Sequence, residues 1–210
     1  MIKIENTSVY GWEEAIRGMR NPMNSWDKSD SVFSMGDTFV GENDLALMGK
    51  LAKGGSTHAK YRRMIAVYVN ITAPLYWWKE FDTYKVGTVA NSCSTMHKIH
   101  SKEFEWEDFS WEHLYSDYDK ENLGSEELAH YILTALNRYR DRYLQTKSKE
   151  DWWQMIQLLP SSYNQKRTIM LNYEVLVGMY RDRKNHKLDE WHTLCEWIEK
   201  LPHSEIIIRS

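Results

Sequence analysis

The chain has 210 residues, of which 42% are hydrophobic and 27% are charged, and its net charge is −3. This composition is typical of a globular domain with a sizeable core, and the acidic balance argues against a generally basic nucleic-acid-binding protein. The two cysteines, Cys93 and Cys195, form no disulfide framework. We find no apolar run long enough to span a membrane and no N-terminal signal pattern, so we expect a cytoplasmic protein without a membrane anchor.

The first part of the chain predicts two helices separated by a polar segment. Asn43 is a suitable N-cap for the second helix, and Gly54 and Gly55 are suited to end it. The expected elements are a short strand at 2–4, a helix at 10–19, a loop at 21–41 and a helix at 43–53.

The clearest strand signal lies at 64–72, where apolar residues alternate with period two. Proline donates no hydrogen bond to a sheet, so the Ala73-Pro74 pair is expected to end this strand. Helical spacing follows at 75–84, and residues 86–95 resemble a loop. The residues that would share the buried face of the strand are Ile65, Val67, Val69 and Ile71.

The second half of the chain is predominantly helical. Ser125 is expected to cap a long helix, and three further helices are expected at 149–158, 162–182 and 187–200. Strand signals early in the chain and helices late in it predict one α+β domain over residues 1–210.

An acidic and aromatic segment at 102–121 precedes the long helix, with eight carboxylates and six aromatic residues. It can be a surface insertion whose aromatic rings pack inward while its charges face water. It can also be a lid over a planar ligand. A third interpretation is an acidic surface that imitates nucleic acid and binds a basic protein partner.

Four stretches of the chain have the order and spacing of one known family. They are LMGKLAKGGSTHAKYRRMIAVYVNITAP (47–74), YWWKEFDTYKVGTVANSCST (76–95), LLP (158–160) with Asn172 twelve residues after Pro160, and Arg183 eleven residues after Asn172. This arrangement resembles that of the flavin-dependent thymidylate synthases. In that family the second stretch carries an Arg-His-Arg signature and contacts nucleotide phosphate. His186 and Glu190 also resemble the family's His-x-x-x-Glu ending.

The resemblance implies a thymidylate-synthase-like fold, with an antiparallel sheet packed with long helices. It implies a transferase of nucleotide biosynthesis that acts at C5 of a deoxyuridine-type pyrimidine nucleotide. FAD would be the cofactor, and NADPH and a reduced folate would be co-substrates. Because the family builds its sites between subunits, the resemblance also implies a homotetramer.

The resemblance also implies site residues, with Asn172 and Arg183 about three turns apart on one helix. No catalytic residue follows from it, because the flavin carries the transfer in the family and no enzyme nucleophile is needed. The nucleotide-binding residues would be Arg183, Ser94, Asn91 and Lys85, and the flavin-binding residues would be Asn172, Tyr84 and Arg63.

Several family positions hold other residue types in this chain. The Arg-His-Arg signature appears as Thr83-Tyr84-Lys85. These replacements keep two alternatives open: the enzyme acts on another pyrimidine nucleotide, or the same scaffold binds a nucleotide or a protein without catalysis. The other replacements are Ser92 for Glu, and Met96, Ile156 and Glu174 for Arg.

The same residues have simpler interpretations when the family is set aside. Arg183 can lie on a solvated face at a helix C-terminus, Asn172 in a local hydrogen-bond network, and 87–95 in an ordinary turn. His97 and His100 lack a third ligand nearby, so no metal site is expected. In each adjacent tryptophan pair, 77–78 and 152–153, we expect one ring to face the core.

Overall fold

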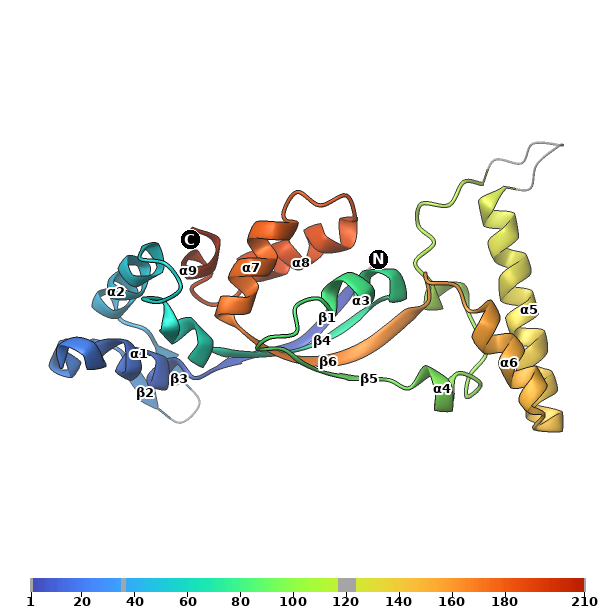
Figure 1. Ribbon diagram of the computed structural model, residues 1–210, viewed down its shortest axis with the longest axis horizontal. Coiled ribbons are helices and arrows are strands. Elements are labelled where there is room, and N and C mark those ends of the chain that lie inside the picture. Colours follow the sequence, from blue (N-terminus) through green and yellow to red (C-terminus); the bar gives the residue numbers. More distant parts are fainter. Residues whose placement is uncertain (1, 35–36, 117–123, 210) are drawn as a thin grey trace. The chain divides into compact units, whose positions relative to one another are not determined.

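The computed structural model describes residues 2–34, 37–116 and 124–209, and Figure 1 shows the elements that they form. The strands are β1 (Lys3–Tyr10), β2 (Val32–Ser34), β3 (Asp37–Phe39), β4 (Ala66–Pro74), β5 (Val89–Ser92) and β6 (Asn164–Asn172). The helices are α1 (Trp12–Arg20), α2 (Glu42–Lys53), α3 (Leu75–Phe81), α4 (Thr95–Lys98), α5 (Ser125–Thr146), α6 (Lys149–Leu158), α7 (Tyr173–Arg183), α8 (Asp189–Glu199) and α9 (Glu205–Ile208). Short 3₁₀ turns lie at η1 (Asn21–Met23), η2 (Trp26–Lys28), η3 (Lys60–Met64) and η4 (Trp106–Asp108). Among the described residues, no helix has the length and apolar character needed to cross a bilayer.

One sheet has the strand order β1-β4-β6-β5, and β2 and β3 form a separate antiparallel hairpin (Figure 1). At one end of β4, Tyr173 N donates to Ile65 O at 3.2 Å, and at the other end Leu75 N donates to Tyr163 O at 3.0 Å. The partners therefore run in opposite directions, which makes β4 and β6 antiparallel. Helices combined with an antiparallel sheet confirm the predicted α+β class.

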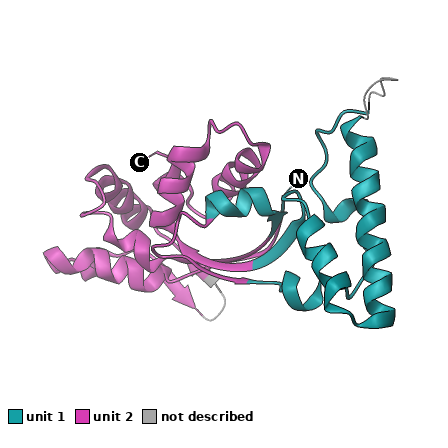
Figure 2. Ribbon diagram, turned by 45° about the vertical axis from the view of Figure 1, so that its right-hand side comes forward, with its two compact units in different colours: residues 1–3, 72–81, 92–167 teal, residues 4–71, 82–91, 168–210 magenta. Residues whose placement is uncertain are grey.

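The chain divides into two compact units, which Figure 2 shows in separate colours. Unit 1 comprises residues 1–3, 72–81 and 92–167, and unit 2 comprises residues 4–71, 82–91 and 168–210. The single domain predicted over residues 1–210 stays a prediction.

The predicted strand at 64–72 is present as β4, with its bounds shifted to 66–74. Its alternating face is buried as expected, and the strand continues through the Ala73-Pro74 pair before α3 begins. The residues on that face, each at most 1% exposed, are Ile65, Val67, Val69 and Ile71.

Helix α2 begins one residue earlier than predicted, and Asn43 does not cap it. The N-cap residue is Gly41, which offers no side-chain hydrogen bond. Instead, the carboxylate of Asp30 accepts hydrogen bonds from the backbone N–H groups of Asn43 at 2.9 Å and Asp44 at 3.1 Å. The Asp30 carboxylate, which lies outside the helix, therefore accepts hydrogen bonds from two backbone N–H groups of the first turn that have no partner within the helix. Gly54 lies at the C-terminal end of the helix, as predicted.

The helix predicted at 162–182 is wrong in its first half, which forms strand β6. Buried Ile169 and Leu171 alternate there with the more exposed Thr168 and Met170. This period of two requires a strand, and a helix would have placed these residues on several faces. Helix α7 begins only at Tyr173, so Asn172 stands at a strand-to-helix junction.

Three other boundaries also differ from the prediction. Strand β1 extends to Tyr10, and β5 lies within the predicted loop at 86–95. The predicted loop at 21–41 contains the β2–β3 hairpin. The N-cap of α5 is Gly124, and the Ser125 hydroxyl accepts a hydrogen bond from Tyr115 N at 2.9 Å. Ser125 therefore ties the preceding segment to the helix and does not cap it.

The adjacent tryptophans pack differently from the prediction in one of the two pairs. Trp77 and Trp78 are both buried, at 0% and 1% exposure, because Phe81 packs against both rings. In the second pair Trp152 is partly buried against the core of unit 1, whereas Trp153 is 40% exposed.

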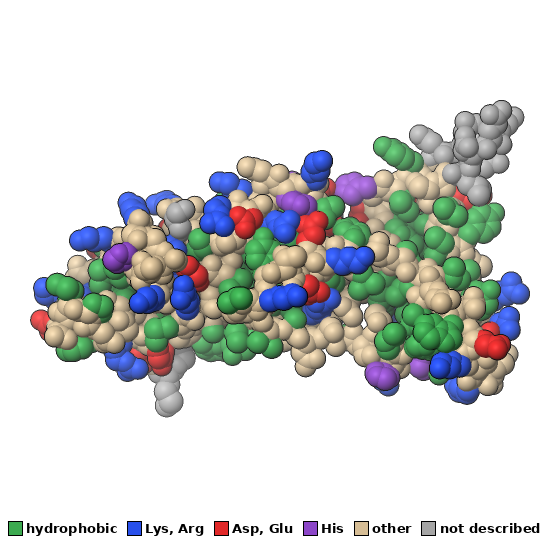
Figure 3. All heavy atoms as spheres, viewed as in Figure 1, with side chains coloured by type: hydrophobic (Ala, Val, Ile, Leu, Met, Phe, Trp, Pro, Cys, Tyr) green, Lys and Arg blue, Asp and Glu red, His purple; other side chains and the backbone are tan. Residues whose placement is uncertain are grey.

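The core of unit 1 includes aromatic residues from the described part of the acidic segment, 102–116. Their rings pack inward, while the carboxylates of Glu103, Glu105 and Glu107 are exposed. Residues 117–121 of the predicted segment lie outside the described residues. Figure 3 shows further hydrophobic side chains at the surface over α5 and α6. The buried residues of this core are Ile99, Phe104, Phe109, Trp111, Ala129, Leu136 and Met155.

A buried ion pair joins α1 to α2 in unit 2. Arg20 Nε lies 2.6 Å from Asp44 Oδ1, and the two side chains are 5% and 0% exposed. The hydroxyls of Ser29 and Ser31 each donate to Asp44 Oδ2 at 2.7 Å. Burial alone would raise the pKa of Asp44, but these hydrogen bonds and the Arg20 charge outweigh burial and lower it.

We expect Asp44→Asn to lower the free energy of unfolding by about 3 kcal/mol, because it leaves the Arg20 charge buried without its partner. Urea unfolding measures this, with exposed Asp27→Asn as the control. A lowered folded-state pKa stabilises the fold above the pKa of the unfolded chain, and this stability is lost as the pH falls through the folded value. The wild type should therefore lose more stability than Asp44→Asn in acid. Equal losses in the two proteins would contradict this account.

Candidate functional site

A cavity of about 790 Å³ in unit 2 brings together four of the seven predicted site residues. The loop between α3 and β5, the first turns of α7 and the end of η3 form its walls. Its volume lies in the range typical of small-molecule sites. The four predicted residues that line it are Arg63, Tyr84, Lys85 and Asn172.

Asn172 holds the junction where β6 ends and α7 begins. Its Oδ1 accepts a hydrogen bond from Val175 N at 3.1 Å, so it is the N-cap of α7. The next residue, Tyr173, donates its backbone N–H to Ile65 O at 3.2 Å, which ties the start of the helix to β4. The local hydrogen-bond interpretation of Asn172 is therefore correct, and the cap explains an amide within an apolar pattern.

Gly87 lets the loop approach this helix start closely. Its φ is +78°, and a Cβ built on it would lie 3.0 Å from Asn172 Nδ2 and 3.1 Å from Val175 Cγ2. A side chain here would therefore meet both the left-handed backbone and the helix cap. The cavity wall formed by Tyr84 and Lys85 depends on this glycine, which the sequence-based prediction missed.

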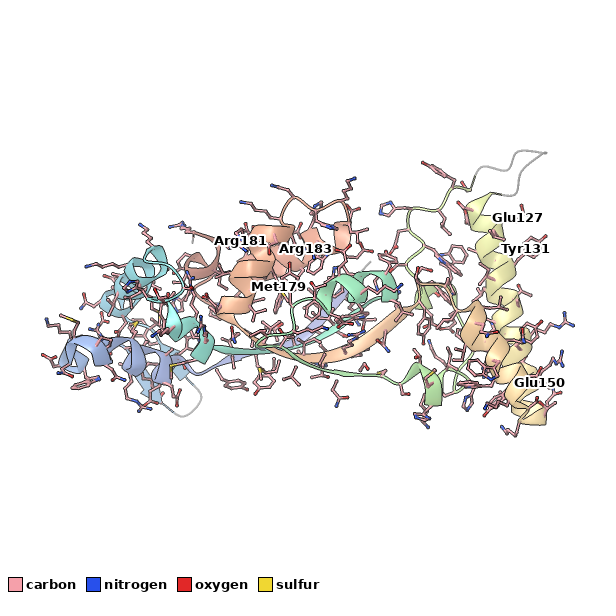
Figure 4. All side chains as sticks on the ribbon, in the orientation of Figure 1. Glu127, Tyr131, Glu150, Met179, Arg181 and Arg183 are labelled. Carbon is pink, nitrogen blue, oxygen red and sulfur yellow. The ribbon has the colours of Figure 1, made fainter. Side chains whose placement is uncertain are left out.

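Arg183 lies at the other end of α7, on its last turn (Figure 4). Its Nε donates to Tyr84 Oη at 2.9 Å, and its guanidinium lies 4.6 Å from the ring centroid of Trp191. The prediction of a solvated arginine is wrong, because aromatic rings half-bury this side chain. Arg183 does not line the cavity itself, and its contact with Tyr84 supports the wall.

The charges around the cavity are mixed. Arg63 and Lys85 are exposed cations on its wall, whereas Glu174 adds a half-buried carboxylate. Buried Arg62 lies 3.6 Å from Glu174 Oε2 and donates to Ile206 O. Glu174 Oε2 is buried and accepts no hydrogen bond within the described residues. The two cations can bind an anionic group, and the carboxylate can accept a hydrogen bond from a ligand.

The remaining two predicted residues do not line this cavity. Ser94 belongs to unit 1, where its hydroxyl caps α4 by accepting a hydrogen bond from His97 N at 3.1 Å. It lines a separate cavity of about 450 Å³ within that unit. Asn91 is an exposed residue of β5. In the part of the chain that the structure describes, no group of three or more His, Cys, Asp or Glu residues could hold a metal ion.

Several solved structures share the fold of this chain. Thymidylate synthase X from Helicobacter pylori with FAD and dUMP has a TM-score of 0.70 and 16% identity, over 99% of this chain and 97% of that one. The chain has the fold of the flavin-dependent thymidylate synthases. A second structure of that Helicobacter pylori enzyme, also with FAD and dUMP, has a TM-score of 0.67 and 16% identity over 99% and 96% of the two chains.

The fold is shared with a methylase as well. The UMP/dUMP methylase PolB from Streptomyces cacaoi, bound with 5-Br dUMP, has a TM-score of 0.63 and 13% identity, over 100% of this chain and 95% of that one. No protein-family profile and no curated protein sequence matches this chain. At these identities the comparisons establish the fold alone.

We expect Gly87→Ala to lower the free energy of unfolding by about 1–2 kcal/mol, because the Cβ of alanine is strained in the left-handed backbone conformation at this position. Gly49→Ala in α2 is the control, since a Cβ there meets nothing within 4 Å. That change should leave stability equal or slightly higher, as alanine favours a helix. Chemical unfolding of both variants tests the account, and equal effects at the two positions would refute it.

We expect Asn172→Ala to lower the free energy of unfolding by about 1 kcal/mol, because α7 loses its N-cap. Asn172→Asp keeps an oxygen at the cap, so its stability should stay close to that of the wild type. The comparison separates the capping role from any role in ligand binding. If both variants lose the same stability, the cap is not the source of the effect.

Proposed function

We propose that this chain is a divergent thymidylate-synthase-like enzyme that binds a flavin and acts at C5 of a deoxyuridine-type pyrimidine nucleotide. The observation that carries the proposal is the convergence of Arg63, Tyr84, Lys85 and Asn172 on one cavity, within a fold shared with nucleotide-modifying enzymes. These residues come from distant parts of the sequence. Their roles are inferred from the family resemblance and from the chemistry of the cavity.

The residues of the cavity suit a phosphate-bearing ring. Arg63 and Lys85 would bind phosphate oxygens, and Tyr84 offers a flat surface that Arg183 holds in place. The amide of Asn172 can donate to a ring carbonyl while its oxygen caps α7. When bound, FAD would supply the electrons of the transfer. The protein's task would be to position the ring and the nucleotide and to exclude water.

The solved neighbours support this choice of ligands. The Helicobacter pylori structures contain FAD and dUMP, and PolB is described as a UMP/dUMP methylase. We extend this to FAD and a pyrimidine nucleotide for the present chain, with NADPH and a reduced folate as co-substrates. A cytoplasmic location and a homotetramer belong to the same proposal. Arg183 and Asn91 would also contact the nucleotide, as the family resemblance implies, and the nucleotide-binding role of Ser94 stays a prediction from that resemblance.

Glu174 favours a second candidate function, a binding protein without catalysis. The family carries arginine at this position, and here a carboxylate lines the cavity beside the two cations. A negative charge there weakens the attraction of the cavity for a phosphate. On this alternative the scaffold binds a nucleotide as a signal, or a protein partner through the acidic segment at 102–121.

Titration with FAD and with dUMP tests the proposal. We expect the purified protein to bind both ligands. Lys85→Ala and Arg63→Ala should each lower the affinity for the ligand whose phosphate that side chain contacts about tenfold, which is the scale of one charged hydrogen bond. Glu174→Gln should strengthen binding of the phosphate-bearing ligand, because it removes the opposing charge and keeps a polar side chain beside buried Arg62. Lys79→Ala, at an exposed lysine of α3, is the matched control.

The outcomes separate the two functions. Flavin binding together with methyl transfer to dUMP supports the enzyme. Nucleotide binding without a bound flavin or turnover supports the binding protein. If neither FAD nor any pyrimidine nucleotide binds, both candidates are wrong.

A further inference from the structure

Gly178 lies in the interior of α7, where a glycine weakens the helix. The helix runs from Tyr173 to Arg183, and Gly178 is the middle one of its 11 residues. Glycine is less favourable than alanine at such a position, because it loses more conformational freedom on folding. A glycine here therefore needs a reason in its surroundings.

The usual structural reasons for a glycine are missing at position 178. Among the glycines that the structure describes, those with positive φ are Gly11, Gly55 and Gly87, so the backbone at Gly178 is one that alanine also adopts. Outside the backbone of its own helix, a Cβ built on Gly178 would meet nothing within 4 Å in the described part of the chain. No neighbouring element therefore approaches closely enough to exclude a methyl group.

Gly178 belongs to the face of α7 that lines the cavity. Residues three and four apart share one face of a helix, so Glu174, Val175 and Gly178 lie together, and all three line the cavity. At Gly178 this wall consists of helix backbone alone. The buried residues of α7 lie on the other side of the helix and are Tyr173, Leu176 and Met179.

The bare backbone at Gly178 continues a wall that begins at the helix cap. Asn172 caps α7, and Gly178 follows six residues later, about 9 Å along the helix axis. Between them, Val175 packs against the loop at Gly87, where a built Cβ would lie 3.1 Å from Val175 Cγ2. Atoms in contact lie about 3.5–4.0 Å apart, so a ligand can fill the layer over Gly178 that a side chain would otherwise take. A wall of this length suits a fused ring system better than a single pyrimidine ring.

Gly49 of α2 shows that open space beside a helical glycine does not by itself make a ligand site. A Cβ on Gly49 would also meet nothing within 4 Å, and Gly49 lines a smaller cavity of about 350 Å³. None of the predicted site residues lines that smaller cavity. The cavity beside Gly178 also contains the flat ring of Tyr84 and the amide of Asn172, which are suited to a planar ligand with ring carbonyls.

We infer that a fused aromatic ring lies flat against α7 at Gly178, and that this residue determines which rings the cavity admits. The inference rests on the proposed function, in which the ring is the isoalloxazine of the flavin. Asn172 would donate to a ring carbonyl, and a side chain at position 178 would push the ring away from the helix. Gly178 is therefore a specificity-determining residue, and it does not stabilise the fold.

Gly178→Ala and Gly178→Leu test this in the full-length protein, because stability and binding should change in opposite directions. Both variants should raise the melting temperature by about 2 °C, since both residues favour a helix over glycine. The affinity for FAD should fall about tenfold in Gly178→Ala and about a hundredfold in Gly178→Leu, because the side chain takes the space of the ring. Gly49→Ala is the matched control, and it should leave FAD binding unchanged.

Riboflavin separates contact with the ring from contact with the phosphates, because it carries the ring without a phosphate. We expect the wild type to quench riboflavin fluorescence on binding. Gly178→Leu should weaken riboflavin as strongly as it weakens FAD, whereas Lys85→Ala should leave riboflavin binding unchanged. The affinity for dUMP should change much less in Gly178→Leu than the affinity for FAD.

The outcomes distinguish this inference from the proposed function. If the wild type binds FAD and both Gly178 variants bind it equally well, the inference is wrong and the proposed function stands. A wild type that binds no flavin contradicts the proposed function and overturns the inference with it. A lower melting temperature in both variants would also overturn the inference, because the fold would then need the glycine.

Discussion

At Asn172 the chain changes from strand to helix, and one side-chain hydrogen bond to Val175 N at 3.1 Å supports that change. The cap lets α7 begin directly after β6, while Tyr173 N fixes the junction to β4 through Ile65 O. Gly87 then brings the loop with Tyr84 and Lys85 against the capped turn. The cavity exists because these three contacts meet at one place, and Arg183 supports its wall from the far end of the same helix.

Much of the fold follows from periodicity, and the exceptions have physical causes. Strand β4 was predictable because one face is wholly apolar, and α6 and α8 were predictable from helical spacing with few breaks. Strand β6 was not, because its polar beginning at 164–167 hides the alternation and the pattern lasts only a few residues. The cap of α2 by Asp30 was also not predictable, since it depends on a contact between distant residues.

In the site, too, some features follow from the sequence near a residue, and others follow only from contacts between distant residues. The resemblance to the family pointed to Asn172 through its spacing from Pro160, and to Tyr84 and Lys85 through their place in the second stretch, and the fold brings all three to one cavity. Ser94 does not line this cavity, and its hydroxyl accepts the hydrogen bond from His97 N that caps α4. The need for glycine at position 87 follows from a close approach that only the fold creates. Glu174 distinguishes the two candidate functions, because its carboxylate shares the cavity with the two cations and opposes the binding of a phosphate.

The central claim is that the cavity beside Asn172 holds the phosphate-bearing ligand. Amide hydrogen exchange, measured with and without saturating FAD or dUMP, tests it most directly because it reports protection along the whole chain. We expect slower amide exchange at 83–88 and at 173–178 when a ligand is bound. Bound ligand that leaves both segments unchanged, while protecting amides elsewhere, would contradict it.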